Sequence, residues 1–219
     1  MPKLKLYMMP FACSRVTLNA LEEAGLDYEV QAINLLKGEQ KSPDYLKIHP
    51  GGKVPALSVD GNIITENAAI LIYLNALAPE AGLLPNTDDP LEQAKLYSDL
   101  IWCSSTFHPA IRQVRAPMRF TDGDTSGVFA KGLEYTNNAL ARVEERVSDG
   151  RWWHGDTWSI VDVYMNWCYT TAASADYSLD KFPAVQDHSA RVQARPSFER
   201  AMARETQVIN ETGFKLPGS

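Results

Sequence analysis

The chain has 219 residues, of which 45% are hydrophobic and 22% are charged, and its formal net charge at pH 7 is -6. This length allows one or two folded domains, and the composition excludes an intrinsically disordered chain. The excess of acidic side chains argues against a nucleic-acid-binding surface, which requires clustered Lys and Arg.

The cysteines and histidines show no pattern of a disulfide framework or a metal site. Cysteines stand at positions 13, 103 and 168 and histidines at 49, 108, 154 and 188, without the close spacing that such sites require. The N-terminal residues lack the apolar core of a signal peptide, and no apolar stretch approaches the roughly 18 residues of a membrane helix. We therefore expect a cytoplasmic protein that binds no metal.

The first part of the chain, residues 1–78, predicts a small α/β domain with the element order strand, helix, strand, helix, hairpin and helix. Alternating apolar residues indicate the strands, helical spacing indicates the helices, and Asp60-Gly61 is a strong hairpin turn signal. The expected elements are strands at 3–9 and 28–33, helices at 14–25, 43–48 and 66–78, and hairpin strands at 56–59 and 62–64.

A change of composition marks the end of this domain. Residues 79–90 are rich in Pro, Gly, Asn and Asp and indicate a linker. Beyond it the pattern is helical, so we expect an all-α domain over 91–219. Apolar residues follow helical spacing from 97 to 118, with bends at Pro109 and Pro117, and form an amphipathic helix from 129 to 147.

A capping motif begins the next helix. Ser159 can cap the helix while the Asp162 carboxylate reaches back, and Trp158 and Val163 can form a hydrophobic staple across it. The helix that continues to Ala173 is apolar nearly all round, so we expect it at the buried centre of its domain. Asp162 is therefore predicted to be a folding residue rather than a catalyst.

Cys13 is the candidate for chemistry because it lies where a strand turns into a helix. Unpaired backbone N–H groups and the helix dipole favour an anion there, and they tend to lower the pKa of a thiol from about 8.5 toward about 3.5–7.5. Val16 stands where a dithiol motif would need its second cysteine, so a dithiol oxidoreductase is disfavoured. The alternative role for Cys13 is a small residue that fills the turn, and Ser14 is the competing catalytic candidate. Cys103 and Cys168 are expected to pack in apolar helix faces.

Several segments together resemble a bacterial cytosolic glutathione transferase, close to the beta-like, cysteine-bearing branch, over essentially the whole chain. This resemblance implies a thioredoxin-like N-terminal domain, an all-α C-terminal domain and a homodimer. The segments that carry it are Pro10-Phe11-Ala12-Cys13-Ser14, residues 21–26, residues 45–50, Gly52-Lys53-Val54-Pro55-Ala56-Leu57, residues 65–70 and the capping segment 159–162.

The resemblance also implies a glutathione site. Pro55 would be cis, which would aim the backbone of Val54 at the cysteinyl unit of glutathione. Glu66 and Asn67 would receive the γ-glutamyl end, since a helix N-terminus suits its carboxylate and Glu66 suits its ammonium group. Asn67 stands where the family more often has Ser or Gly.

The remaining implied residues lie on either side of this site. The glycyl carboxylate of glutathione would meet Lys37 and Lys53. Phe11, in the loop before Cys13, and His108, on the long helix after the linker, would line the hydrophobic-substrate pocket, although His108 is as well explained by packing or solvation.

The implied activity is detoxification by conjugation. Glutathione would bind across the two domains with its sulfur near Cys13, and the thiolate would attack a small, largely apolar electrophile. Whether Cys13 or Ser14 activates the sulfur stays open. Three alternatives also remain: a specialised glutathione-dependent isomerase, ether-cleaving lyase or dehalogenase; a disulfide reductase or peroxidase; and a binding protein that kept the fold without turnover.

Overall fold

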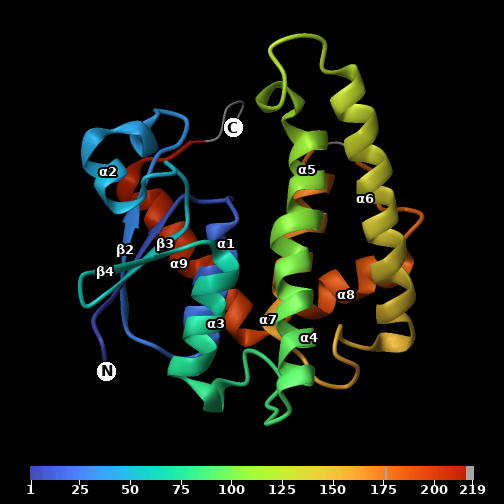
Figure 1. The fold of residues 1–219 in the computed structure, drawn as a ribbon, viewed down its shortest axis with the longest axis horizontal. Coiled ribbons are helices and arrows are strands. Elements are labelled where there is room, and N and C mark those ends of the chain that lie inside the picture. The colour runs from blue at the N-terminus through green and yellow to red at the C-terminus, as the bar shows by residue number, and fades with distance from the viewer. Residues whose placement is uncertain (176, 216–219) are drawn as a thin grey trace. The chain divides into compact units, whose positions relative to one another are not determined.

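The computed structural model describes residues 1–175 and 177–215. It contains two compact units, one formed by residues 1–83 with the C-terminal helix and the other by residues 84–194. The first unit is α/β, and the helices of the second, green to orange in Figure 1, form an all-α unit. The expected fold class is therefore confirmed. Within the described residues, no helix is long and apolar enough to cross a membrane.

The first unit is built on a four-stranded mixed sheet with the strand order β2-β1-β3-β4. β1 pairs parallel to β2 and antiparallel to β3, which forms a hairpin with β4. Helix α1 joins the two parallel strands, and α3 follows the hairpin. The bounds in this unit are β1 Leu4–Met8, α1 Ser14–Glu23, β2 Tyr28–Ala32, α2 Pro43–Ile48, β3 Ala56–Val59, β4 Asn62–Thr65 and α3 Asn67–Leu77.

The turn between β3 and β4 has the backbone conformation that its Asp60-Gly61 sequence predicts. Asp60 and Gly61 both have positive φ, at 50° and 87°, the backbone conformation that two-residue hairpin turns require and that Gly adopts without a steric cost. The Asp60 carboxylate also accepts a hydrogen bond from the Lys3 backbone N–H at 2.8 Å. The predicted order of elements in this unit is confirmed.

The second unit is a helical bundle. A π-helical turn at Cys103–Phe107 separates α4 from α5, Pro109 lies in the first turn of α5, and a short 3₁₀ turn begins at Pro117. The helix thus ends before Pro117, while near Pro109 the backbone stays helical and the hydrogen bonding changes to the π pattern, because proline has no N–H to continue the ladder. The bounds are α4 Pro90–Trp102, α5 His108–Arg115, α6 Ser126–Val147, α7 Ile160–Ala173 and α8 Pro183–Gln193.

Helix α7 lies at the centre of this bundle, and every residue from Ile160 to Tyr169 is buried. The predicted capping box is present: the Ser159 N–H donates to Asp162 Oδ2 at 2.8 Å. Asp162 Oδ1 also accepts from the Trp153 N–H and from His188 Nε2, both at 2.8 Å. Asp162 therefore joins the start of α7 to the preceding loop and to α8.

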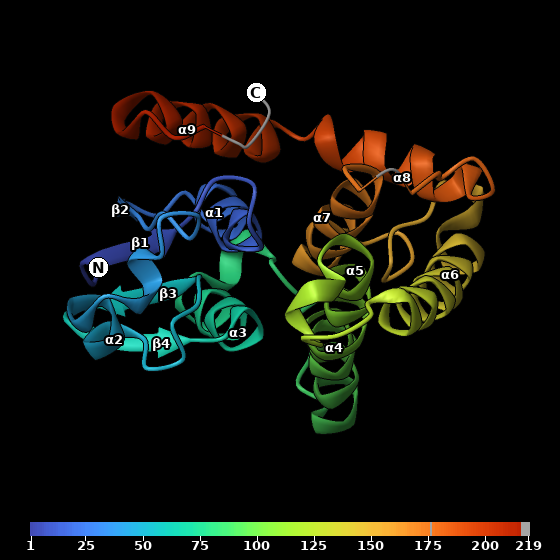
Figure 2. The same ribbon diagram turned by 90° about the horizontal axis from the view of Figure 1, so that it is seen from above.

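Helix α9, Pro196–Thr212, belongs to the first unit although it is last in the sequence. It lies beside α1 in both ribbon views (Figures 1 and 2). Ion pairs join Arg195 to Glu23 at 2.6 Å and Arg200 to Glu22 at 3.3 Å. The two compact units therefore do not follow the linear order of the chain at its C-terminal end.

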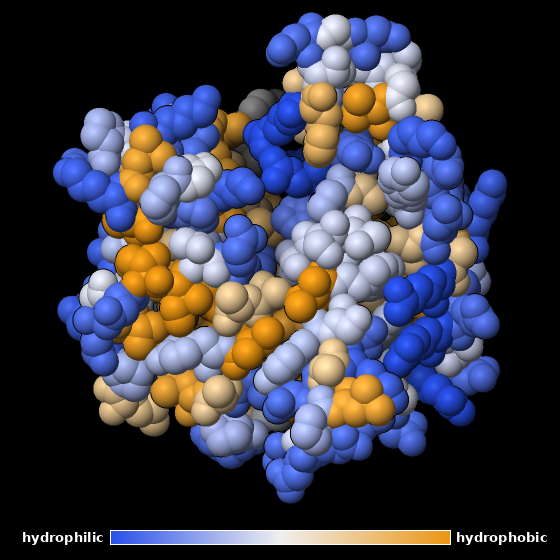
Figure 3. All heavy atoms as spheres, in the orientation of Figure 1, coloured by the Kyte–Doolittle hydropathy of each residue, from blue (hydrophilic) through white to orange (hydrophobic). Residues whose placement is uncertain are grey.

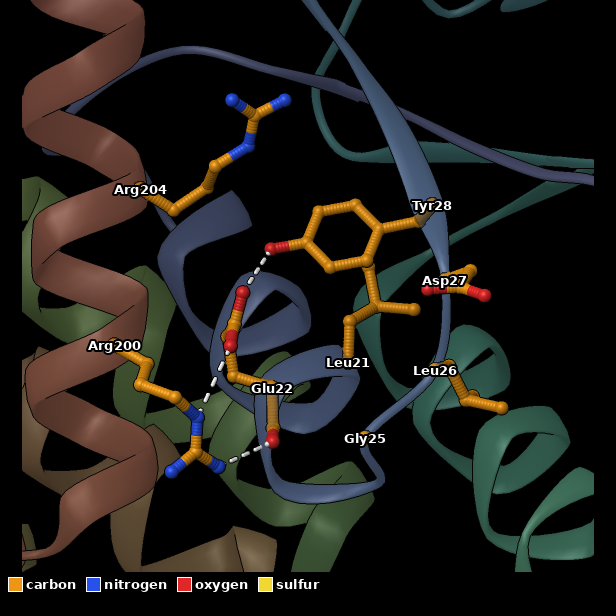
Figure 4. Close-up of a pocket in the computed structure, with 8 residues that line it drawn as sticks. All are labelled: Leu21, Glu22, Gly25, Leu26, Asp27, Tyr28, Arg200 and Arg204. Carbon is orange, nitrogen blue, oxygen red and sulfur yellow. Dashed lines mark hydrogen bonds and ion pairs between the residues drawn. The ribbon is translucent and has the colours of Figure 1, made fainter.

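A cavity of about 550 Å³ opens between α9 and the α1–β2 corner (Figure 4). On its wall the Tyr28 hydroxyl donates to Glu22 Oε1 at 2.5 Å, and Arg200 donates to the other Glu22 oxygen and to the Glu22 carbonyl. Burial is the main cause that raises the pKa of Tyr28, and the hydrogen bond to Glu22 raises it further. None of the predicted site residues lines this cavity, and the bonds between Arg200 and Glu22 on its wall join α9 to α1.

Gly132 permits the close approach of α6 to α5. A Cβ at this position would lie 2.7 Å from the Gln113 Cβ and 3.0 Å from the Val114 backbone N. Replacing Gly132 with Ala is expected to lower the free energy of unfolding by about 1–3 kcal/mol, because the two helices must separate. Guanidinium unfolding measures this change.

Gly127 provides the matched control on the same helix. A Cβ at Gly127 would meet nothing within 4 Å, so Gly127→Ala is expected to be neutral or to stabilise by up to about 1 kcal/mol through helix propensity. Equal effects of the two substitutions would contradict the close-packing explanation.

Candidate active site around Cys13

The turn that follows β1 places Cys13 directly before α1. The Ala12 N–H donates to the Met9 carbonyl at 3.2 Å, and the Val16 N–H donates to the Cys13 carbonyl at 3.1 Å to begin the helix. Phe11 within the turn has a φ of 65°. Cys13 is partly exposed, so its thiol lies at the N-terminus of α1 within reach of a ligand.

The loop before β3 lies against this thiol. Cys13 Sγ donates to the Val54 carbonyl at 3.4 Å, and the Val54–Pro55 peptide is cis, as the resemblance implies. The Tyr45 hydroxyl donates to the Lys53 carbonyl at 2.7 Å and so fastens the same loop to α2. Burial raises the pKa of Tyr45, which keeps this hydroxyl protonated.

Asn67 joins the start of α3 to Cys13. Its side chain is buried; Nδ2 donates to the Cys13 carbonyl at 2.9 Å, and Oδ1 accepts from the Thr17 hydroxyl at 2.6 Å. The Asn67 amide thus has partners within the protein, while Glu66, immediately before it, is exposed. Thr17 carried no signal in the sequence, because its burial and its bond to Asn67 arise only when α1 and α3 pack together.

Replacing Asn67 with Ala is expected to lower the free energy of unfolding by about 1–3 kcal/mol, because the Cys13 carbonyl and the Thr17 hydroxyl both lose a buried partner. Denaturant unfolding checks this, with Asn62→Ala as the control. Asn62 is exposed and its side chain donates to the Val59 carbonyl at 3.3 Å, so its loss is expected to cost less than about 0.5 kcal/mol. A similar cost at both positions would count against the role of Asn67.

The structure separates the two catalytic candidates. Ser14 is buried, and its hydroxyl donates to the Met9 carbonyl at 3.0 Å and accepts from the Met9 N–H at 3.2 Å. The Ser14 side chain is thus occupied in holding the turn together. Cys13 is the more exposed of the two, and its side chain faces the Val54 loop.

The other predicted site residues lie at several places. Lys37 and Lys53 are exposed on loops of the first unit, and Phe11 packs against Phe214 with ring centroids 6.3 Å apart. His108 belongs to the second unit, where Nδ1 lies 3.1 Å from the Tyr164 hydroxyl. The first unit therefore brings together Cys13 with Val54, Pro55 and Asn67.

Cys103 and Cys168 are fully buried, as expected for packing residues. Burial raises the pKa of the Cys103 thiol well above its ordinary value, so it remains protonated. Of the three cysteines, Cys13 is thus the partly exposed one.

The fold and the site together define a class of protein. Its first domain is thioredoxin-like, its first helix begins at a cysteine beside a cis-proline loop, and an all-α unit follows. Residues 2–76 match the family model Glutathione S-transferase, N-terminal domain, and residues 116–196 match Glutathione S-transferase, C-terminal domain.

Individual relatives agree with these matches. The chain is 31% identical over 203 residues to maleylacetoacetate isomerase of Pseudomonas aeruginosa, covering 91% of this chain and 94% of that protein. It is 52% identical over 86 residues to a zeta class glutathione S-transferase of Euphorbia esula, covering 38% of each. A sphingomonad glutathione S-transferase complexed with glutathione superposes with a TM-score of 0.81 at 31% identity, covering 92% and 98% of the two chains. The chain belongs to the glutathione transferase superfamily of enzymes.

Proposed function

We propose that this protein binds glutathione beside Cys13 and transfers its thiolate to small, largely apolar electrophiles. The observation that carries the proposal is the meeting of three segments at one cysteine: the turn after β1, the loop before β3 and the start of α3. Cys13 Sγ contacts the Val54 carbonyl, and Asn67 Nδ2 holds the Cys13 carbonyl. The sphingomonad relative that superposes on the chain is complexed with glutathione, which supports the same ligand here.

The parts of glutathione are assigned by charge. The ammonium group of the γ-glutamyl unit faces the exposed Glu66 carboxylate, and its carboxylate faces the N-terminus of α3. The cysteinyl unit pairs with the backbone of Val54 next to Pro55. The exposed side chains of Lys37 and Lys53 attract the glycyl carboxylate.

Cys13, rather than Ser14, is proposed to act on the glutathione sulfur, because the Ser14 hydroxyl is buried and already has two partners. We propose on this basis that the protein belongs with the bacterial, cysteine-bearing, beta-like branch that its sequence resembles. In the reaction the glutathione thiolate forms a carbon–sulfur bond with the electrophile as a leaving group departs with its electron pair. The rate gain comes from positioning and from stabilisation of the thiolate by the helix N-terminus.

A second candidate is glutathione-dependent isomerisation, and a specific observation favours it. The Pseudomonas aeruginosa relative, which the chain matches over 94% of that protein's length, is named maleylacetoacetate isomerase. A zeta class glutathione S-transferase is 52% identical to the chain over 86 residues. In this reaction the thiolate would add to a conjugated cis double bond, the new single bond would rotate, and elimination would release the trans product with glutathione unchanged.

Measuring how much glutathione is consumed per product distinguishes conjugation from isomerisation. Calorimetric titration first establishes glutathione binding, and the enzyme is then assayed with an aromatic halide and with a cis-unsaturated keto acid. Conjugation consumes one glutathione per product, whereas isomerisation proceeds with catalytic glutathione. Intact-mass analysis detects a glutathione adduct on Cys13, the result expected of a disulfide reductase. Absence of glutathione binding would overturn the proposal in favour of a binding protein that recognises another ligand.

We infer further that the protein is a cytoplasmic homodimer. Figure 3 shows hydrophobic atoms gathered in patches on the drawn face, and the exposed large apolar side chains of α4 include Leu91 and Ile101, which are 63% and 48% exposed. All three cysteines are free thiols, which suits a reducing compartment. Light scattering at several concentrations tests the assembly, and a monomer throughout would contradict the homodimer.

A further inference from the structure

Glu205, on α9, is buried to an extent unusual for a carboxylate. Only 2% of the residue is exposed, and Arg15 on α1 donates to both of its oxygens, from Nε at 3.1 Å and from a terminal nitrogen at 2.5 Å. A carboxylate this deep is costly unless all its lone pairs have partners. A third donor to this carboxylate is the backbone N–H of Phe11, which donates to Oε1 at 3.2 Å.

The bond to Phe11 differs from the other links between α9 and α1. Arg195 and Arg200 already pair with Glu23 and Glu22 on α1, so α9 is attached without Glu205. Glu205 instead reaches the turn that leads into α1. Its position on α9, 194 residues after Phe11 in the sequence, makes this a tertiary contact.

Phe11 needs such a partner because its backbone is strained. Its φ of 65° lies in the left-handed region, which bulky residues rarely adopt. The Phe11 ring packs against Phe214 just after α9, and the Arg15 guanidinium lies 5.4 Å from the ring centroid. Glu205 within α9 therefore holds the backbone of Phe11, and Phe214 just after α9 packs against its side chain.

We propose that Glu205 is a positioning residue that fixes the Pro10–Cys13 turn and thereby sets where the Cys13 thiol lies relative to the Val54 carbonyl. The inference rests on the proposed function, in which Cys13 acts on the glutathione sulfur. Cys13 follows Phe11 by two residues, so a change in the Phe11 backbone displaces the start of α1 and the 3.4 Å contact of Sγ with Val54.

Two matched double variants separate positioning from simple attachment. Arg15→Met with Glu205→Met removes the acceptor for the Phe11 N–H without leaving an unpaired buried charge. Arg15→Gln with Glu205→Gln also removes both charges but keeps a side-chain carbonyl that can accept the same bond. Both variants lack the ion pair, so a difference between them at the Pro10–Cys13 turn reports whether residue 205 offers an acceptor to the Phe11 N–H.

Two readouts are measured on the full-length protein. Amide hydrogen exchange of the peptide that spans the turn is expected to rise in the methionine variant and to stay near wild type in the glutamine variant. In glutathione turnover the methionine variant is expected to lose at least about tenfold in kcat with little change in the KM for glutathione. The glutamine variant is expected to remain within about threefold of wild type.

The outcomes are distinct. Equal exchange in the two variants overturns the proposal, as does faster exchange in the methionine variant with an unchanged kcat. If wild type neither binds nor turns over glutathione, the proposed function fails, while exchange at the turn still shows whether Glu205 holds Cys13 in place.

A third variant tests the reason for the bond. Phe11→Gly makes the left-handed backbone conformation free of steric cost, so the exchange difference between the methionine and glutamine variants is expected to shrink in this background. An undiminished difference would mean that Glu205 does not act by holding the strained Phe11 backbone.

Discussion

The Asp162→Ala protein is expected to lose about 3–5 kcal/mol of its free energy of unfolding, because each buried donor left without a partner costs about 1–3 kcal/mol. The carboxylate accepts from the Ser159 N–H, the Trp153 N–H and His188 Nε2, each at 2.8 Å, and Asp162 and His188 are fully buried. All three donors would lose their partner at once, whereas loss of a helix cap alone costs about 1 kcal/mol.

Chemical denaturation and calorimetry measure this effect, and Asp156→Ala is the control. Asp156 lies in the loop that precedes α7 and is exposed, so its replacement is expected to change the free energy of unfolding by less than about 0.5 kcal/mol. A loss near 1 kcal/mol for Asp162→Ala would show that the capping box matters and the links to Trp153 and His188 do not.

The Cys13→Ala protein is expected to form no mixed disulfide with glutathione and to lose about 100- to 1,000-fold in kcat for glutathione transfer. This magnitude is that of removing one preorganised group beside a developing charge. Cys13 is the partly exposed cysteine, and its Sγ lies 3.4 Å from the Val54 carbonyl. Intact mass after incubation with oxidised glutathione and steady-state kinetics provide the two measurements.

Cys168→Ala is the matched control for the chemistry. Cys168 is fully buried in α7, so its loss is expected to reduce stability slightly and to leave the glutathione adduct on Cys13 intact. Full retention of every activity in Cys13→Ala would remove Cys13 from the catalytic role. The proposal would then have to rest on backbone groups alone, because Ser14 is buried with both of its hydrogen bonds made inside the turn.

The local features of the chain could be predicted because neighbouring residues produce them. Turn chemistry, capping and periodicity act over a few residues. They account for the Asp60-Gly61 hairpin, the capping box of Ser159 and Asp162, the helix changes near Pro109 and Pro117, and the position of Cys13 at a helix start. The cis peptide before Pro55 came from the family resemblance, since an X–Pro bond can take either form.

Contacts between distant segments carried no signal in the sequence. The sequence around each residue does not show that His188 hydrogen-bonds the Asp162 carboxylate or that Gly132 lies against Gln113. It also does not show that Glu205 accepts a hydrogen bond from the Phe11 N–H, 194 residues away. The burial of Ser14, which favours Cys13, likewise depends on how the turn folds onto β1. Such contacts arise from packing, where burial makes an unpaired polar group or an added methyl group costly. The amino-acid pattern thus determined the elements and the thiol at a helix start, while the packed structure determined which side chains hold that thiol in place.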